Sequence, residues 1–212
     1  MARKTKEEAL ATRNQLLDAA EQLFSTQGVA RTSLHEIAEA AGLTRGAIYW
    51  HFDNKGDLLT ALWERAAAPL RASFDQDCGD SGDDPLGRLR MLASFKARHI
   101  ENDPRVRAVM TILMLRCEFS EETRNATDYF SHEREYAYSR VSEVFRRAVE
   151  MGQLPASVNI DQAVISLFCF IDGIVFHWLT NPARFPLSVT ALNAIDAYLA
   201  GLRTKEAAHP SA

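Results

Sequence analysis

The stretch from Ser33 to Lys55, SLHEIAEAAGLTRGAIYWHFDNK, decides the fold of this chain because it encodes two short helices joined by a tight turn. Ser33 and Glu36 have the spacing of a capping box, in which two side chains satisfy the free amides at a helix start. Gly42 predicts the end of that helix, because glycine adopts a left-handed backbone at little cost. The stretch therefore predicts a helical hairpin with a defined turn.

A second short helix follows the turn. Thr44 is its expected N-cap, and we place Ile48, Tyr49 and Phe52 on its inner side. A helix-turn-helix needs small residues where its helices cross, a glycine in the turn and a β-branched anchor under the second helix, and this stretch has all three. An ordinary helical hairpin with a glycine in its turn is the alternative. The favoured interpretation is a DNA-binding unit whose second helix enters the major groove.

The outward residues of this unit have chemistry suited to DNA. A guanidinium can bind guanine O6 and N7 together, so we expect Arg45 to read a base, with a phosphate contact as its alternative. Ala47 suits a thymine methyl group, and Lys55 suits a phosphate because it lies at a helix N-terminus. For Ser33 capping is an equal alternative, and Trp50 can instead support the helix. The predicted DNA-contacting set is Arg3, Lys4, Lys6, Thr32, Ser33, Thr44, Arg45, Gly46, Ala47, Tyr49, Trp50, His51 and Lys55.

Residues 44–59, TRGAIYWHFDNKGDLL, resemble the signature of the TetR family of bacterial transcriptional repressors, as do residues 7–34, EEALATRNQLLDAAEQLFSTQGVARTSL. The opening MARKTK, the run RGAIYWHF and the later CEF at 117–119 are similar to the AcrR-type branch, which represses multidrug efflux pumps. The resemblance is dense over residues 1–65 and thin afterwards. It implies a repressor that binds double-stranded operator DNA as a homodimer.

Composition sets limits on other functions. The chain has 212 residues, 47% of them hydrophobic, and a formal net charge of −4, so bulk basicity does not indicate DNA binding. The opening MARKTKEEAL has no apolar core of a signal peptide, so we expect a cytoplasmic protein with reduced thiols at Cys78, Cys117 and Cys169. Their spacing fits no metal site. We expect no metal and no cofactor.

The periodicity predicts an all-α fold of about nine helices, with no β segment. We divide the chain into a three-helix DNA-binding domain at 1–53, a ligand-sensing and dimerisation domain at 54–205 and a flexible tail at 206–212. Helices are expected at 7–27, from Asn54 onward, and at 86–102, 104–119, 121–151, 161–180 and 188–202, with a solvated loop at 75–85. The helix from Asn54 enters both domains and is the expected mechanical connector.

The segment 161–180, DQAVISLFCFIDGIVFHWLT, is apolar on nearly every face. A membrane span is disfavoured because Asp172 and His177 interrupt it and no positive cluster flanks it. We expect it to be covered by its own domain on one side and by a second subunit on the other, in a four-helix interface with 188–202 that the resemblance also implies. The predicted interface residues are Val164, Phe168, Ile171, Val175, Trp178, Leu192, Ile195 and Leu199.

The larger domain is expected to hold a lipophilic small-molecule inducer. Large apolar and adaptable methionine side chains predict its cavity, although plain core is the alternative for each. The predicted ligand-binding residues are Trp63, Met91, Phe95, His99, Met110, Met114 and Phe130. No catalytic motif is present, so we expect no enzyme. Release by a protein anti-repressor or by cysteine oxidation at Cys117 is the alternative regulation, and a helical enzyme or scaffold is the remote one.

Overall fold

The computed structural model describes residues 6–79, 83–118 and 120–204, with side chains left undescribed between 69 and 79. Over these residues the chain forms nine α-helices and no strand, which confirms the all-α prediction. In chain order they are α1 (Lys6–Gln27), α2 (Leu34–Ala40), α3 (Arg45–His51), α4 (Lys55–Gly79), α5 (Pro85–Asn102), α6 (Pro104–Thr111), α7 (Arg124–Glu150), α8 (Ile160–Thr180) and α9 (Leu187–Arg203). A π-helical turn, Ile112–Arg116, follows α6, and a 3₁₀ turn, Glu121–Thr123, precedes α7.

Two boundaries differ from the prediction. The segment at 75–85 was predicted to be a loop, but α4 continues through Pro69 to Gly79. Each aspartate near its end costs a helix only a few tenths of a kcal/mol. The helix predicted at 104–119 is shorter, since α6 changes into the π turn after Thr111. The predicted tail at 206–212 lies outside the described residues.

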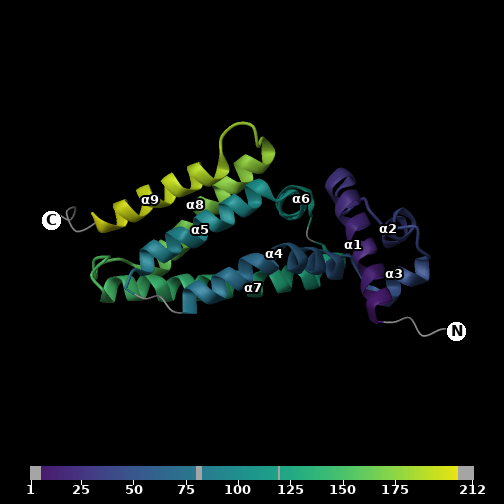
Figure 1. The fold of residues 1–212 in the computed structure, drawn as a ribbon, viewed down its shortest axis with the longest axis horizontal. Helices are drawn as coiled ribbons and strands as arrows, with labels where there is room; N and C mark the ends of the chain where they lie inside the picture. The colour runs from purple at the N-terminus through teal and green to yellow at the C-terminus, as the bar shows by residue number, and fades with distance from the viewer. Residues whose placement is uncertain (1–5, 80–82, 119, 205–212) are drawn as a thin grey trace. The chain divides into compact units, whose positions relative to one another are not determined.

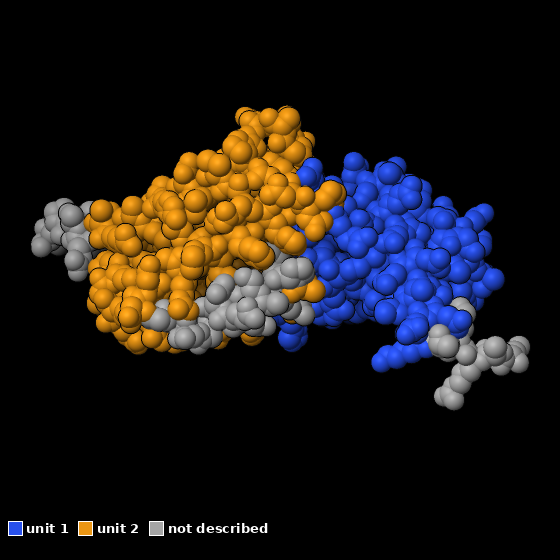
Figure 2. All heavy atoms as spheres, viewed as in Figure 1, with its two compact units in different colours: residues 1–67, 105–132 blue, residues 68–104, 133–212 orange. Residues whose placement is uncertain are grey.

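The chain packs as two compact units, shown in different colours in Figure 2. Unit 1 comprises residues 1–67 and 105–132, and unit 2 comprises residues 68–104 and 133–212. Both α4 and α7 therefore contribute residues to each unit. These units are defined by packing alone, so the functional division after residue 53 stays a prediction.

The core of unit 1 fixes the helix-turn-helix. Leu16, Leu17 and Phe24 of α1 are fully buried, as are Ile37 of α2 and Ile48 of α3. Contacts join α1 to α2, α2 to α3 and α1 to the π turn. Burying each of these side chains contributes about 1.5–3 kcal/mol, so the two short helices are held by α1 rather than by their own propensity.

Unit 2 is built on α5, α8 and α9, where α9 runs beside both of the other two (Figure 1). Its core includes Phe145 of α7 and Leu86 of α5, both buried. The carboxylate of Glu101, at the end of α5, accepts hydrogen bonds from the backbone amides of Leu187 at 2.8 Å and Ser188 at 3.2 Å. A negative charge at a helix start is favourable, so Glu101 helps to fix where α9 begins.

Helix α8 is long and apolar enough to cross a membrane by length and composition, and only it qualifies within the part of the chain that the structure describes. Core helices of soluble proteins meet the same criteria, so one such helix is weak support for a membrane span. Val164, Val175 and Trp178 of α8 are buried in unit 2, whereas Ile165 and Phe170 are exposed. The helix is thus covered by its own unit on one side only.

Candidate nucleic-acid interface

The first helix of the helix-turn-helix begins and ends as the sequence predicts. The Ser33 hydroxyl accepts a hydrogen bond from the Glu36 amide at 3.2 Å, and the Glu36 carboxylate accepts one from the Ser33 amide at 2.7 Å. The bond from the Ser33 amide, and after it the bond that the Ser33 hydroxyl donates to the same carboxylate at 2.7 Å, lower the pKa of the Glu36 carboxyl. Gly42 has φ 68°, and the next residue, Leu43, donates its amide to the Ala38 carbonyl at 2.8 Å. Ser33 is therefore the N-cap of α2.

Helix α3 is anchored by one buried side chain. Ile48 is fully buried, while the Thr44 hydroxyl accepts a hydrogen bond from the Ala47 amide at 3.3 Å. Tyr49 was predicted on the inner side, which is wrong: it is 45% exposed. A residue adjacent to Ile48 is rotated by about 100° around the helix, whereas Phe52, four residues on, returns to the inner side and is buried.

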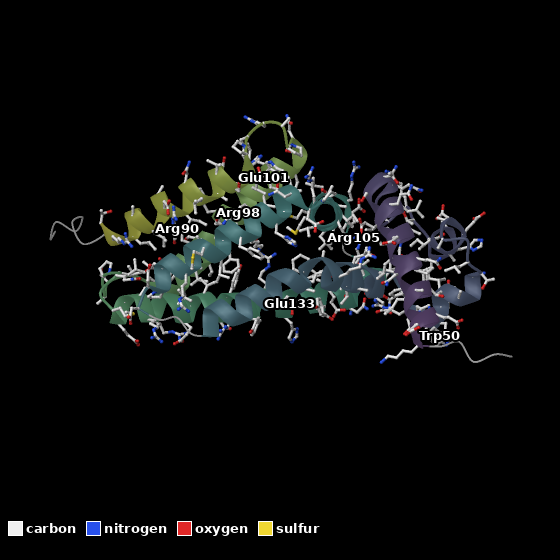
Figure 3. The ribbon with its side chains drawn as sticks, in the orientation of Figure 1. Trp50, Arg90, Arg98, Glu101, Arg105 and Glu133 are labelled. Atoms are coloured by element: carbon white, nitrogen blue, oxygen red, sulfur yellow. The ribbon has the colours of Figure 1, made fainter. Side chains whose placement is uncertain are left out.

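The outer face of α3 combines aromatic and cationic groups. Arg45, Gly46, Tyr49 and Trp50 are exposed, and Ala47 and His51 are half-buried. The Arg45 guanidinium lies 5.8 Å from the centre of the Tyr49 ring, as in a cation–π contact. Trp50, labelled in Figure 3, is 72% exposed. An indole this exposed is unusual on a protein surface without a partner, so this face has the composition of a binding surface.

Two residues that were predicted to bind DNA phosphates make contacts inside unit 1 in the structure. Thr32 is 1% exposed, and its hydroxyl donates to the Gly28 carbonyl at 2.8 Å, so it is not available to DNA. The Lys55 ammonium lies 2.7 Å from the Glu122 carboxylate and donates to the Val29 carbonyl at 3.2 Å. Arg3 and Lys4 fall outside the described residues. Lys6 is exposed at the first turn of α1.

The segment that follows α6 is bonded to the start of α4 and to the α1–α2 turn. The Val29 amide donates to the Arg116 carbonyl at 3.0 Å, and Glu122 pairs with Lys55 as above. Asn125, in the first turn of α7, donates to the carboxylate of Asp57. Segment 116–125 thus contacts both elements that flank the helix-turn-helix. Sequence reasoning missed these contacts because the partners lie far apart in the chain.

The fold agrees with that of known proteins. The family model described as "Bacterial regulatory proteins, tetR family" matches residues 16–62, and "MAATS-type transcriptional repressor, C-terminal region" matches residues 84–204. The chain belongs to the TetR family. The TtgR regulator of Pseudomonas putida is 36% identical over 211 residues, with 98% of this chain and 99% of that protein covered. TetR proteins are transcriptional regulators, so this chain is a DNA-binding regulator and not an enzyme.

Solved TetR structures are also similar over almost the full chain. The crystal structure of NalD from Pseudomonas aeruginosa, described as the secondary repressor of the MexAB-OprM multidrug efflux pump, has a TM-score of 0.85 at 32% identity, with 94% of this chain and 99% of that chain covered. The complex of SmeT with triclosan has a TM-score of 0.79 at 34% identity, with 95% of this chain and 96% of that chain covered. TetR repressors bind operators and small molecules and act as dimers.

The predicted ligand-binding residues form two groups, one in each unit of this TetR protein. In unit 1, the Trp63 and Phe130 rings meet edge to face at 6.2 Å, and Met110 and Met114 are half-buried. The buried Trp63 Nε1 has no hydrogen-bond partner among the described groups. In unit 2, the Phe95 and His99 rings are stacked 5.9 Å apart on α5, and Met91 is 59% exposed.

Most predicted dimer residues of α8 and α9 are buried within the protomer. Val164, Val175, Trp178, Ile195 and Leu199 are in this buried set. Phe168 and Ile171 pack against the same core, and Leu192 is half-buried. Burial leaves these side chains little surface for a partner. The exposed apolar side chains of the two helices are their neighbours Ile165, Phe170, Phe176 and Val189, which the prediction did not select.

The structure gives little support to redox sensing by Cys117 or to metal binding. Burial raises the pKa of the Cys117 thiol, and the nearby Glu118 charge adds to the effect. A raised pKa lowers the fraction of reactive thiolate, which disfavours Cys117 as an oxidation sensor. No group of three or more potential metal ligands occurs within residues 6–79, 83–118 and 120–204.

Proposed function

We propose that this TetR protein is a cytoplasmic repressor of a multidrug efflux operon, released from a palindromic operator by a lipophilic small molecule. The observation that carries the DNA-binding part is the exposed face of α3, with Arg45, Tyr49 and Trp50 outward over a fully buried Ile48. The efflux part follows from similarity to NalD and SmeT, whose descriptions name multidrug efflux pumps.

In this proposal Arg45 reads a base, and Thr44, Tyr49 and His51 bind phosphates. Thr44 and Arg45 lie at the N-terminal end of α3, the end that enters the major groove in helix-turn-helix proteins. Gly46 has no atom within 4 Å of where a Cβ would be, so the backbone there is open to DNA. A twofold dimer places two such helices on the DNA, which requires a roughly palindromic site.

We propose that the homodimer forms through the outer faces of α8 and α9. Ile165 is 51% exposed and Val189 is 54% exposed, and Phe170 and Phe176 are also exposed. Exposed apolar side chains of this size support a protein interface. This surface replaces the buried residues that the sequence suggested.

Release requires a ligand that binds the DNA-incompetent conformation more tightly than the competent one. Trp63 lies on α4, the helix whose first turn carries Lys55, so displacement of its ring can move the end of α4 that adjoins the helix-turn-helix. The contacts of Glu122 with Lys55 and of Arg116 with Val29 provide a second connection, from the segment after α6 to the elements that flank the helix-turn-helix. A protein anti-repressor is the alternative means of release.

Footprinting on the DNA flanking the gene tests the repressor assignment, and Arg45→Ala tests base reading. We expect Arg45→Ala to weaken operator binding by about 1–3 kcal/mol and to relax preference at one base position. The control is Arg184→Ala, which removes the same charge outside the helix-turn-helix. An unchanged ratio of operator to random-DNA affinity in Arg45→Ala would make Arg45 a phosphate contact. Absence of any protected site would refute the repressor assignment.

A thermal-shift screen with lipophilic cations, antibiotics and triclosan tests the inducer. Triclosan is included because it is bound in the SmeT complex. We expect at least one compound to raise the melting temperature and to release operator. If none does either, the protein anti-repressor becomes the leading mechanism.

A further inference from the structure

A lysine occupies a core position on α5. The core-facing side of this helix carries Leu89, Leu92 and Ile100, which are all buried, and Lys96 falls between Leu92 and Ile100 at the same four-residue spacing. Lys96 is half-buried, and this burial lowers the pKa of its ammonium group. An apolar side chain is the usual occupant of such a position.

Two other helices bring charged groups to this point of unit 2. Arg134 and Tyr138 lie one turn apart on α7, and Phe168 and Asp172 lie one turn apart on α8. The Tyr138 and Phe168 rings meet 4.5 Å apart, and one turn along the Arg134 guanidinium donates to the Asp172 carboxylate at 3.1 Å. The electrostatic influence of Asp172 and Arg134 reaches Lys96 from these helices.

The pair formed by Arg134 and Asp172 leaves Lys96 without a counterion of its own. Asp172 is within 4 Å of Arg134, and no salt bridge between Asp172 and Lys96 occurs in the described structure. Burial lowers the pKa of Lys96, the attraction of Asp172 opposes this effect, and the repulsion of Arg134 adds to it. A partly desolvated ammonium with no close anion is unfavourable, and a bound anion would reduce that cost.

A second unpartnered group lies one turn along α5. The Nε2 atom of His99 is buried and forms no hydrogen bond with any group that the structure describes. Residues three apart on a helix are neighbours on its surface, so Lys96 and His99 project from the same side of α5. The His99 ring also stacks on Phe95, with the ring planes 6° apart. An aromatic ring thus adjoins an unpartnered imidazole nitrogen and an ammonium group that has no close anion.

We infer that Lys96 and His99 form a binding site for the acidic group of a lipophilic organic anion, such as an aromatic carboxylate. The Lys96 ammonium neutralises the acid, His99 Nε2 contributes a hydrogen bond, and the Phe95 ring packs against the apolar part. This inference rests on the proposed function, because it names the chemical class of the inducer. It separates this chain from a sensor that accepts lipophilic molecules without regard to charge.

The experiment compares 2-naphthoate with 2-naphthamide, which have similar shape and differ in charge. Binding to the full-length protein is measured by isothermal titration calorimetry without DNA, for wild type, Lys96→Met and Arg98→Met. Arg98, labelled on α5 in Figure 3, is exposed, so its variant removes the same charge from the surface of the same helix. Lys96→Met should fold at least as well as wild type, because it fills a core position with an apolar chain.

We expect wild type and Arg98→Met to bind naphthoate about ten- to a hundredfold more tightly than naphthamide, the range for one hydrogen bond to a charged group. In Lys96→Met this preference should disappear while naphthamide affinity is retained. Equal affinities in wild type, the same preference in Lys96→Met, or no binding of either compound would overturn the inference. Binding that depends on Lys96 but does not release operator would preserve the anion site and refute the inducer function proposed above.

Discussion

Gly56 in the first turn of α4 should accept a side chain only at a cost in stability while Asn125 is present. A Cβ atom built on Gly56 would lie 1.8 Å from Asn125 Oδ1 and 2.8 Å from Asn125 Cγ. The Asn125 side chain donates to the Asp57 carboxylate, so moving it away removes that hydrogen bond. Because Gly56 has no positive φ, alanine fits the backbone itself, and the main obstacle is Asn125.

The expected free-energy changes have opposite signs in two backgrounds. In wild type, Gly56→Ala gains up to about 1 kcal/mol of helix propensity. It loses roughly 1–3 kcal/mol through crowding and the displaced hydrogen bond, so we expect net destabilisation of about 1–2 kcal/mol. In Asn125→Ala the obstacle is gone, and Gly56→Ala should stabilise the protein by about 0.5–1 kcal/mol.

Urea denaturation of the four proteins in this double-mutant cycle measures the coupling. A second neighbour, Asn54 Oδ1 at 3.0 Å from the added Cβ, is present in both backgrounds and cancels in the comparison. If Gly56→Ala changes the free energy of unfolding equally in both backgrounds, within about 0.5 kcal/mol, the contact between α4 and α7 does not have the energetic role assigned to it.

Three further outcomes are expected. Ile165→Asp should convert the dimer to a monomer in sedimentation. The control Met151→Asp changes an exposed apolar residue outside α8 and α9 and should stay dimeric. If Ile165→Asp also stays dimeric, the proposed interface is wrong. Because folding lowers the pKa of the Glu36 carboxyl, the stabilisation from this group is present above the ordinary pKa of 4.5 and is lost as the pH falls through the lowered pKa. The difference in urea midpoint between wild type and Glu36→Gln should therefore shrink between pH 6 and pH 3. Because the pKa of Cys117 is raised, mild peroxide should leave operator binding by wild type and Cys117→Ser equally intact, and a loss confined to wild type would favour the oxidation mechanism.

Local signals were predictable from sequence, and distant partners were not. The capping box of Ser33 and Glu36 and the turn at Gly42 depend on residues close in the chain, so their geometry was predicted correctly. Thr32 has a residue type that suits phosphate, yet tertiary packing buries it. Lys55 was assigned to DNA because its ion-pair partner, Glu122, belongs to a distant segment.

The sequence could not separate the exposed side of α8 from its buried side, for a different reason. A helix that is apolar all around, as α8 nearly is, has no periodicity that tells its inner from its outer side. Phe168 packs on the core and Phe170 is exposed, and only packing distinguishes the two. Lys96 breaks the apolar pattern of α5, and this was the signal in the sequence that could have located the proposed anion site.

The most direct test of the account is the affinity of an inducer measured with and without operator DNA. The compound is the strongest stabiliser from the thermal-shift screen, and tryptophan fluorescence reports its binding through Trp63, whose ring contacts Phe130. Coupling between two sites is reciprocal, so operator should weaken inducer binding by the same factor by which inducer weakens operator binding. Equal inducer affinity in the presence and absence of operator would contradict the claim that this protein is a ligand-responsive repressor.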